Sequence, residues 1–403
     1  MWCCMKIRNS MLKRVFLCLT IFSMIAVPAL YPFFCLVFSV DIFFCQRGKI
    51  KSSVYFFAEL LFVLYALFQV VSGITSNSQL TMSISRSLIL MLLFEYSLFV
   101  YLSKDYDIKA RIYDICSAGV LALLFTAAVF SPSIIQTGRL TANDKSMSLL
   151  GGFVGGHSST ALSMTTAILL GVYWIFLLGE NRWRDGIYSV IGVALLFLCG
   201  SRKNIVMLVI FFVVKVYHGE RERTIKFLKY STECLLGIIA LYYAVMNIPA
   251  LYETWGSRLK NVLDFYITGT VSDGSIGMRA YLISVAQTAY QKKKLFGWGL
   301  NTFGYVINPN SYYAHNNFLE LLSTGGIVGF VLFYLRYAVL LVELASRGKK
   351  RENRQFVVPL IALQLLLIVL EWWQVSYMYE NIMFVQVIML AYCKLAESRK
   401  GKM

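Results

Sequence analysis

A histidine flanked by polar side chains is the strongest candidate for chemistry in this sequence. His315 lies in the run YYAHNN, residues 312–317, where a long polar segment meets a hydrophobic one. An imidazole titrates near neutral pH and can take a proton from a hydroxyl group as a general base. Asn316 and Asn317 can orient the ring through its second nitrogen. A lone histidine at such a junction packs as often as it reacts, so the neighbouring residues carry this prediction.

The residues that follow His315 strengthen the pattern. The stretch HNNFLELLSTGGIVG, residues 315–329, has Gly326 and Gly329 three positions apart. Small residues at that spacing let two membrane helices approach closely. Glu320 lies about one helical turn beyond His315. An acid at membrane depth is a functional candidate, and this one could orient an arginine or a histidine.

The remaining histidines and the cysteines offer weaker candidates. His218 lies at the end of a predicted helix, where the helix dipole stabilises a positively charged side chain. His157 follows GGFVGG and could cap a helix, pack at its start or touch a ligand. The nine cysteines form no CxxC pair and no cluster with histidine at zinc spacing. We therefore expect free thiols, no metal and no cofactor.

The composition places these residues in a membrane protein. Of the 403 residues, 58% are hydrophobic and only 15% are charged, with a mean hydropathy of +0.65. Soluble domains have roughly 45–50% apolar and about 25% charged residues. Apolar runs recur along almost the whole chain, which excludes a soluble enzyme and a soluble domain on a single anchor. We expect an all-α polytopic membrane protein.

About twelve transmembrane helices are predicted with a window of roughly 20 apolar residues, the length that crosses a bilayer core. They cover residues 11–27, 29–45, 53–74, 84–103, 112–131, 157–179, 186–200, 203–218, 231–249, 314–343, 356–374 and 377–395. The first could pass for a signal peptide, but Ala26-Val27-Pro28 is a poor cleavage site and another span follows at once. We expect it to be retained.

Positive charges predict the orientation of these helices. Lysines and arginines concentrate in the segments on the same side as the N-terminus, and such segments face the cytoplasm. Both termini are therefore expected inside. The net charge of +17 reflects this asymmetry and an attraction to anionic lipids. Because the basic residues form no groove interleaved with aromatics, the charge does not indicate a nucleic-acid partner.

One outer segment is long enough to carry a site. Residues 250–314 lie between the ninth and tenth predicted helices and include an amphipathic pattern, Met278 to Tyr290, and the turn Gly297-Trp298-Gly299. Structureless loops of this length are uncommon, so we expect a partly helical extracytoplasmic loop. The predicted regions are N-terminal helices at 1–130, a catalytic region at 131–345, and C-terminal helices with a cytoplasmic tail at 346–403.

Around His315 the sequence resembles the O-antigen ligase and O-antigen or capsule polymerase superfamily. Its ligases carry a His followed directly by Asn, Ser or Gln. Nine variable residues then lead to a Gly, and two more lead to a Gly, Thr or Tyr. His315, Asn316, Gly326 and Gly329 match all of these fixed positions. GSRKN at 200–204 is similar to its Ser-Arg hairpin, and residues 277–304 are similar to its pattern of an Arg, a helix and a basic stretch that leads to Gly-x-Gly. Residues 138–164 look like its Gly-Arg and Gly-Phe region, except that Gly156-His157 stands where the family has Pro-Asn. The resemblance covers roughly 130–345.

The resemblance implies transfer of a glycan from an undecaprenyl-diphosphate donor to an acceptor hydroxyl at the outer membrane face. The leaving diphosphate gains negative charge, and arginine binds phosphate oxygens bidentately while staying protonated. The acceptor hydroxyl needs a general base. The expected catalytic residues are His315, Arg279 and Arg202, and the expected substrate-binding residues are Arg258, Arg139, Asn316, Asn317 and Glu320.

A polymerase that joins undecaprenyl-diphosphate-linked repeat units into O-antigen, capsule or exopolysaccharide is the function we expect. The outer acids Glu253, Asp264 and Asp273 are scattered, which favours single-displacement inversion without a metal. Two alternatives remain: a ligase that transfers glycan to lipid A core and, less favoured, a flippase or transporter. The expected partners are lipid-linked donor and acceptor, membrane lipids and a chain-length regulator. The expected location is the bacterial inner membrane.

Overall fold

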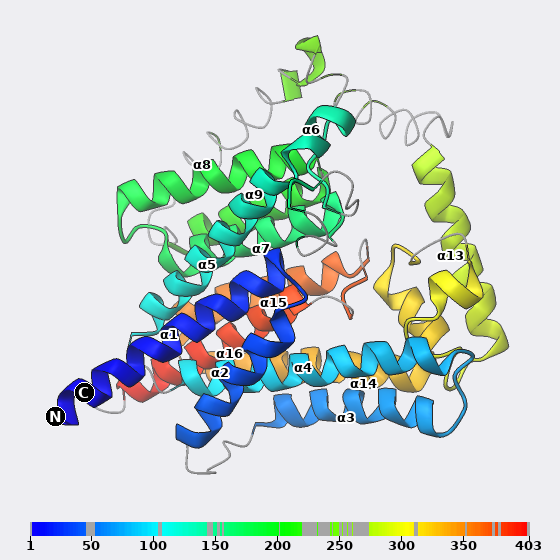
Figure 1. Ribbon diagram of the computed structural model, residues 1–403, viewed down its shortest axis with the longest axis horizontal. Helices are drawn as coiled ribbons and strands as arrows, with labels where there is room; N and C mark the ends of the chain where they lie inside the picture. Colours follow the sequence, from blue (N-terminus) through cyan, green and yellow to red (C-terminus); the bar gives the residue numbers. More distant parts are fainter. Residues whose placement is uncertain are drawn as a thin grey trace. The chain divides into compact units, whose positions relative to one another are not determined.

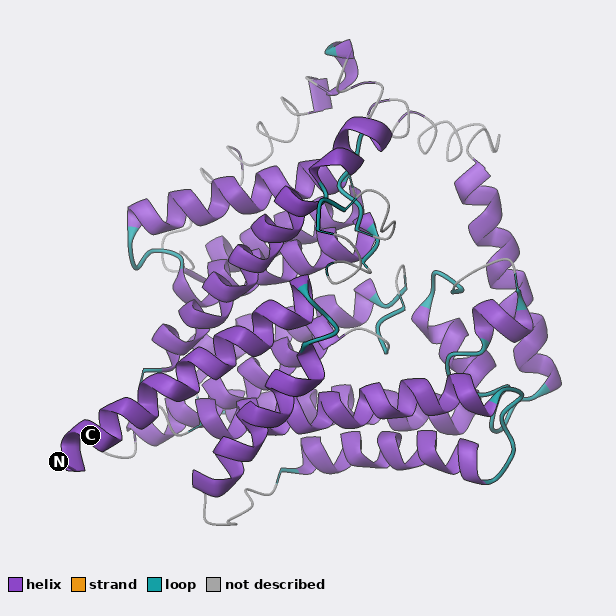
Figure 2. Cartoon of the chain, viewed as in Figure 1, coloured by secondary structure: helices purple, strands orange, loops and turns teal. Residues whose placement is uncertain are grey.

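The computed structural model of the protein is helical (Figure 1). The structure describes residues 2–45, 53–103, 107–142, 148–150, 154, 157–200, 202–219, 232, 242–243, 245–249, 252, 256, 260, 274–309, 313–350, 353–372, 375–377 and 380–400. Helices, turns and loops make up these residues, with no strand among them (Figure 2), so the prediction of an all-α chain is confirmed. The ninth predicted span and residues 261–273 of the outer loop lie largely outside the described residues.

The chain forms two compact units, each described by itself. The first comprises residues 1–48 and 101–259, and the second residues 49–100 and 260–403. The first unit contains α1 (Trp2–Ala26), α2 (Tyr31–Cys45), α5 (Ile108–Val129), α6 (Ser131–Thr137), α7 (Ser159–Leu177), α8 (Arg182–Cys199) and α9 (Arg202–Gly219). The second contains α3 (Val54–Val71), all but the last two residues of α4 (Ser78–Leu102), α13 (Gly274–Lys292), η4 (Phe303–Ile307), α14 (Asn317–Gly348), α15 (Arg354–Leu370) and α16 (Glu380–Lys400).

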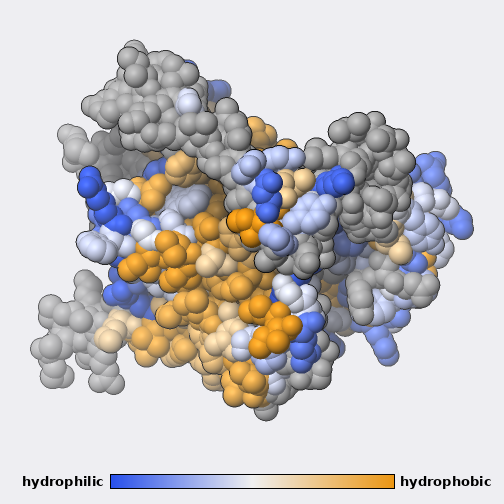
Figure 3. Space-filling view, turned by 90° about the horizontal axis from the view of Figure 1, so that it is seen from above, coloured by the Kyte–Doolittle hydropathy of each residue, from blue (hydrophilic) through white to orange (hydrophobic). Residues whose placement is uncertain are grey.

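Five helices among the described residues are long and apolar enough to cross a membrane: α3, α4, α5, α7 and α14. Shorter apolar helices cover Tyr31–Phe44, Phe356–Leu370 and Phe384–Lys394. Large apolar side chains are exposed on these helices, including Phe57, Val342 and Val369, and Figure 3 shows broad apolar surface in orange. These features indicate a multi-pass membrane protein. The total of twelve spans stays a prediction.

The helix α7 is the centre of the first unit and is buried along nearly its whole length. It packs against α5, α8 and α9. A Cβ atom on Gly171 would lie 2.3 Å from the ring of Phe211 on α9, and one on Gly119 of α5 would lie 2.5 Å from Cδ1 of Leu169 on α7. Glycine therefore sets the distance between these helices, as is common in membranes.

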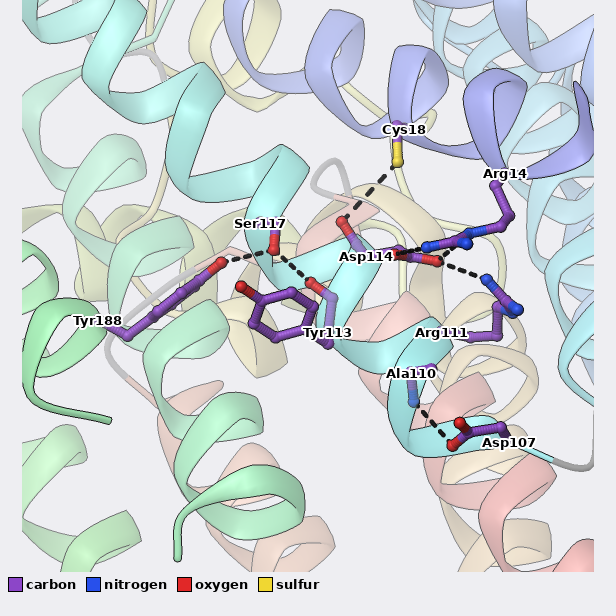
Figure 4. A network of polar contacts seen from close by, with 9 residues as sticks. All are labelled: Arg14, Cys18, Asp107, Ala110, Arg111, Tyr113, Asp114, Ser117 and Tyr188. Atoms are coloured by element: carbon purple, nitrogen blue, oxygen red, sulfur yellow. Dashed lines mark hydrogen bonds and ion pairs between the residues drawn. The ribbon is translucent and has the colours of Figure 1, made fainter. Parts of the chain in front are cut away.

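A shared carboxylate joins α1 to α5 in the first unit (Figure 4). Asp114 accepts hydrogen bonds from Nε and Nη2 of Arg14, at 2.9 and 2.8 Å, and from Nη1 of Arg111 at 2.7 Å. Such charge-assisted, bidentate pairs are stronger and more directional than neutral hydrogen bonds. One turn further along α5, Ser117 lies 2.5 Å from the hydroxyl of Tyr188 on α8. The two contacts fix α5 between its neighbours.

The long helix α14 organises the second unit. It packs against α3, α13, α15 and α16. The helix α13 includes residues Met278 to Tyr290. Its Leu282 and Ala286 form a small core cluster with Phe303 of η4 and with Ala314, the residue before His315. This packing places Ala314 and the start of α14 beside α13 and η4.

Candidate active site

His315 lies just before α14 in an unusual backbone conformation. Its φ angle is 58°, in the left-handed region that non-glycine residues rarely adopt. The next residue, Asn316, is the extended N-cap of α14, and its side chain accepts a hydrogen bond from the backbone N–H of Leu319 at 3.1 Å. The half-buried imidazole lies 4.0 Å, between ring centroids, from Tyr313. Strain of this kind persists where the surrounding structure enforces it, often at functional sites.

Glu320 holds the backbone on the other side of His315. Its fully buried carboxylate accepts a hydrogen bond from the N–H of Ala314, with 2.6 Å between nitrogen and Oε2. The hydroxyl of Tyr377 donates to Oε1 at 3.3 Å and accepts from the N–H of Asn301 at 3.1 Å. Asn301 also has a left-handed φ, of 63°. One chain of hydrogen bonds thus connects Asn301 to Ala314, the residue before His315.

Asn317 ties the start of α14 to the turn between α15 and α16. Its backbone N–H donates to the carbonyl of Glu371 at 2.9 Å, and its side-chain oxygen accepts from the N–H of Ser376 at 3.0 Å. Its side-chain nitrogen donates to the hydroxyl of Tyr334 at 3.0 Å. The sequence predicts that Asn316 and Asn317 orient the imidazole. In the structure these amides cap α14 and anchor the turn, so they fix the backbone that carries it.

Gly326, the first of the two glycines three positions apart, breaks α14. Its φ of 63° and ψ of −171° interrupt the helix. Segment 294–299 fills the break: Trp298 and Gly299 N–H donate to the carbonyls of Ser323 and Thr324, and Ile327 and Val328 N–H donate to those of Lys294 and Leu295, at 2.8–3.2 Å. The backbone groups released by the break are thereby satisfied, which irregular backbone in a membrane protein requires.

Only glycine fits at this crossing of two backbones. A Cβ atom on Gly326 would lie 2.3 Å from the carbonyl oxygen of Leu295, and one on Gly297 would lie 2.4 Å from that of Thr324. Gly329 plays the role that the sequence predicts, because a Cβ there would lie 2.8 Å from the ring of Tyr65 on α3. For Gly326 the reason differs: a broken helix, rather than helix–helix contact, requires it.

Two polar side chains of α3 hold the inserted segment in place. The buried Gln69 donates from its amide nitrogen to the carbonyl of Phe296 at 2.7 Å and accepts from the N–H of Leu300 at 3.0 Å. The hydroxyl of Tyr65 lies 2.5 Å from the carbonyl of Gly325. Sequence reasoning missed both residues, as it missed Tyr377 and Asn301. A glutamine near the end of an apolar helix is the signal that could have found Gln69.

Loops that the sequence places on the outer side meet at this end of the second unit. The N–H of Ser76, after α3, donates to the carbonyl of Trp298 at 2.8 Å. The 371–377 turn contacts both Asn317 and Asn301. These contacts join three separate stretches of the chain, and one of them, the turn that contains Ser376 and Tyr377, also contacts the start of α14 at Asn317.

Arg279 lies on the same helix as the core cluster beside His315. It is exposed near the start of α13, one turn before Leu282, whose side chain packs with Ala314. Residues three apart lie on neighbouring positions of a helix surface. Arg279 and His315 are therefore carried by parts of the second unit that pack against one another.

The other predicted residues belong to the first unit or lie outside the described residues. Arg139 is half-buried, and its side chain lies 3.3 Å from where a Cβ of Gly200 would be. The segment continues beside the start of α7, since Ala142 N–H donates to the carbonyl of His157 at 3.0 Å. Arg202 is the first residue of α9, with its side chain outside the described part, as is all of Arg258. Burial lowers the pKa of His157, which favours its neutral form.

Within the described residues, no three His, Cys, Asp or Glu side chains group closely enough to hold a metal ion. The cysteines described, Cys18, Cys35, Cys116, Cys199 and Cys393, are free thiols. The second unit carries the imidazole of His315 over a buried hydrogen-bonded support, and the exposed guanidinium of Arg279 on the helix that packs beside it. Such a set can accept a proton and stabilise an anion.

Fold and site together define a helical membrane protein whose broken helix presents a strained histidine. A family model described as O-antigen ligase matches residues 187–334. The match includes α13, the inserted segment, His315 and both glycines at 326 and 329. The resemblance to the O-antigen ligase and polymerase superfamily is thereby confirmed. No curated protein is similar enough to the chain to count as a match.

Proposed function

We propose that the protein is a polysaccharide polymerase that joins undecaprenyl-diphosphate-linked oligosaccharide repeat units at the outer face of the bacterial inner membrane. Members of the matched family are glycosyltransferase-like enzymes that act on polyprenyl-linked glycans. The observation that carries the proposal is the left-handed His315, held between the Asn316 cap and the Glu320 carboxylate.

In the proposed reaction the acceptor hydroxyl gives its proton to the imidazole of His315 as its oxygen forms a bond to the anomeric carbon of the donor. The bond from that carbon to the diphosphate oxygen breaks, and the electron pair leaves with the diphosphate. Arg279 stabilises this growing charge, with Arg202, Arg258 and Arg139 as further candidates. A single displacement inverts the anomeric centre, and no metal takes part.

Glu320 and Asn317 act in this proposal through the backbone. Both side chains are buried and hydrogen-bonded to groups of the protein itself. Asn316 caps the helix at the same place. We therefore assign these three residues to the positioning of His315. Positioning matters because a general base must lie within hydrogen-bond reach of the hydroxyl proton that it abstracts.

The orientation of the chain is part of the proposal. Charge asymmetry supports a cytoplasmic position for both termini and an outer position for the loops around His315. The contacts of the 72–77 turn, the 294–302 segment and the 371–377 turn support this arrangement, because segments predicted on one side of the membrane lie together. Lipid-linked glycan, membrane lipids and a chain-length regulator are the proposed partners.

Replacing His315 by alanine tests the chemistry. We expect polymer growth to stop in cells while the amount of protein in the membrane persists, and the same for Arg279→Ala. Exposed Tyr305→Phe on η4 is a matched control that should grow polymer normally. Unchanged polymer length in His315→Ala would remove this residue from the site.

The ligase is the closest alternative, since its motif matches the chain at every fixed position. Deleting the gene separates the two functions. Loss of long chains with single repeats still on the surface lipid supports a polymerase, whereas long chains that accumulate on the polyprenyl carrier indicate a ligase. A flippase would instead leave unreacted repeats on the inner side.

A further inference from the structure

A cleft on α13 lies outside the groups assigned to the reaction. It is an open surface cleft lined by one face of α13, by Trp298 and by η4, with a volume of about 330 Å³. This volume falls within the range of ligand sites, about 300–1,000 Å³. All of its walls belong to the second unit.

One wall of the cleft is polar. Ser284, Thr288 and Lys292 follow one another at intervals of four residues and so share a face of α13. The hydroxyl of Ser284 donates to the carbonyl of Tyr281 at 2.7 Å, and that of Thr288 to the carbonyl of Ser284 at 2.9 Å. Their oxygen lone pairs stay available as acceptors, and the exposed Lys292 supplies donors.

The opposite side of the cleft is a fixed aromatic ring with aliphatic neighbours. The indole nitrogen of Trp298 donates to the carbonyl of Ala289 at 2.9 Å, and the ammonium of Lys293 lies 4.3 Å from the ring centroid. Both contacts hold the ring against α13. Val306 and Ile307 of η4 complete an apolar wall.

The cleft adjoins the candidate active site. Val285 and Ile307 line it, and both also pack against the core cluster that contains Ala314, the residue before His315. One small apolar cluster of the second unit thus lies next to both the cleft and the residue before His315.

We propose that this cleft binds an oligosaccharide, the sugar units of the glycan next to the one that reacts. A pyranose ring has apolar C–H faces that pack on an aromatic ring and a rim of hydroxyls that exchange hydrogen bonds. In the proposed complex Trp298 packs against the C–H faces of the sugar rings. Ser284, Thr288 and Lys292 form hydrogen bonds with the sugar hydroxyls. Lys292 also favours a repeat unit with an acidic sugar. The inference rests on the proposed function and adds the place where its glycan is held.

Calorimetric titration of the full chain in lipid nanodiscs tests the proposal. The probe is the repeat-unit oligosaccharide that mild acid releases from the polyprenyl-diphosphate pool of the source cell. Thr288→Trp fills the cleft and should weaken binding at least tenfold. Thr288→Val and Lys292→Gln, which change one polar group each, should weaken it two- to tenfold. Gln291→Trp adds the same ring at an exposed position of α13 outside the cleft and should change affinity less than twofold.

The outcomes separate this inference from the proposed function. His315→Ala should bind the oligosaccharide as the unmodified protein does while polymer growth stops. If His315→Ala still grows polymer, the proposed reaction fails, and the binding data still decide the cleft. Should Thr288→Trp not fold, Thr288→Val and Lys292→Gln decide. Absence of binding to the unmodified protein, or affinities within twofold in every cleft variant, overturns the inference.

Discussion

The hydroxyl of Tyr377 lies 3.3 Å from the carboxylate of Glu320, and both side chains are fully buried. Through this contact the turn between α15 and α16 supports the backbone before His315, because the same carboxylate accepts from the N–H of Ala314. The Tyr377 hydroxyl also accepts a hydrogen bond from the N–H of Asn301. A residue far along the chain thus helps to hold the two left-handed positions of the site.

Removing this hydroxyl should slow glycan transfer without changing the chemistry. Tyr377→Phe leaves the Asn301 N–H and one carboxylate oxygen without a partner, at a cost of roughly 1–3 kcal/mol for a buried group. We expect transfer to fall about tenfold, with an unchanged pH profile. Glu320→Gln should act in the same direction, and the double variant should lose less than the product of the two effects. Rates in purified membranes measure this, and fully multiplicative losses would contradict a shared network.

Gly326 and Gly325 make a matched pair for the helix break. Gly326→Ala puts a Cβ atom 2.3 Å from a backbone carbonyl at a left-handed φ, a conformation that alone costs of order 1–3 kcal/mol. Gly325→Ala meets only an ordinary contact, 3.4 Å from Leu300. We expect Gly326→Ala to lose heat stability and transfer, and Gly325→Ala to keep both. Size-exclusion profiles after graded heating measure stability, and equal behaviour of the two variants would reject the break.

A buried arginine on α14 offers a test of charge inside the second unit. Arg336 is 1% exposed, with electrostatic partners in Glu59 of α3 and Glu95 of α4, and its guanidinium lies 4.3 Å from the ring of Phe333. Arg336→Met leaves two buried acids without their cation, and breaking a buried pair costs about 3–5 kcal/mol. Stability should therefore fall sharply.

Neutralising the acids as well should restore part of that stability. In the variant that combines Arg336→Met with Glu59→Gln and Glu95→Gln, no buried charge is left uncompensated in this cluster. Thermal melting of the purified chain compares the two. A triple variant less stable than Arg336→Met would show that the acids contribute through other contacts.

Labelling tests the predicted orientation. In a background with every cysteine replaced, Ser76→Cys and Gln291→Cys should react with a membrane-impermeant maleimide in intact spheroplasts. Lys349→Cys, after α14, should react only after the membrane is permeabilised. These expectations follow from the charge asymmetry and from the contact between Ser76 and Trp298. If Ser76→Cys and Gln291→Cys were labelled from opposite sides of the membrane, both the topology and that contact would be refuted.

The sequence predicts the candidate residues more completely than their roles. The spacing of His315, Asn316, Gly326 and Gly329 is visible in one stretch of letters, because they belong to one helix and its cap. Their contacts are not visible there: Asn316 caps α14, Asn317 anchors a turn, and Gly326 breaks the helix. Contacts with segments far away in the chain decide these roles, and a single sequence does not display such contacts.

What the amino-acid sequence determines by itself is a helical chain in a membrane, with a histidine motif where a polar segment meets an apolar one. Hydropathy and charge suffice for this, because they act on each segment separately. Only the tertiary structure decides that Glu320 and Tyr377 support His315, that Gln69 holds the segment inserted at Gly326, and that Trp298 closes a cleft. These are packing relationships between segments that are distant in the sequence. The backbone groups that the helix break leaves unpaired within α14 form hydrogen bonds with such a distant segment.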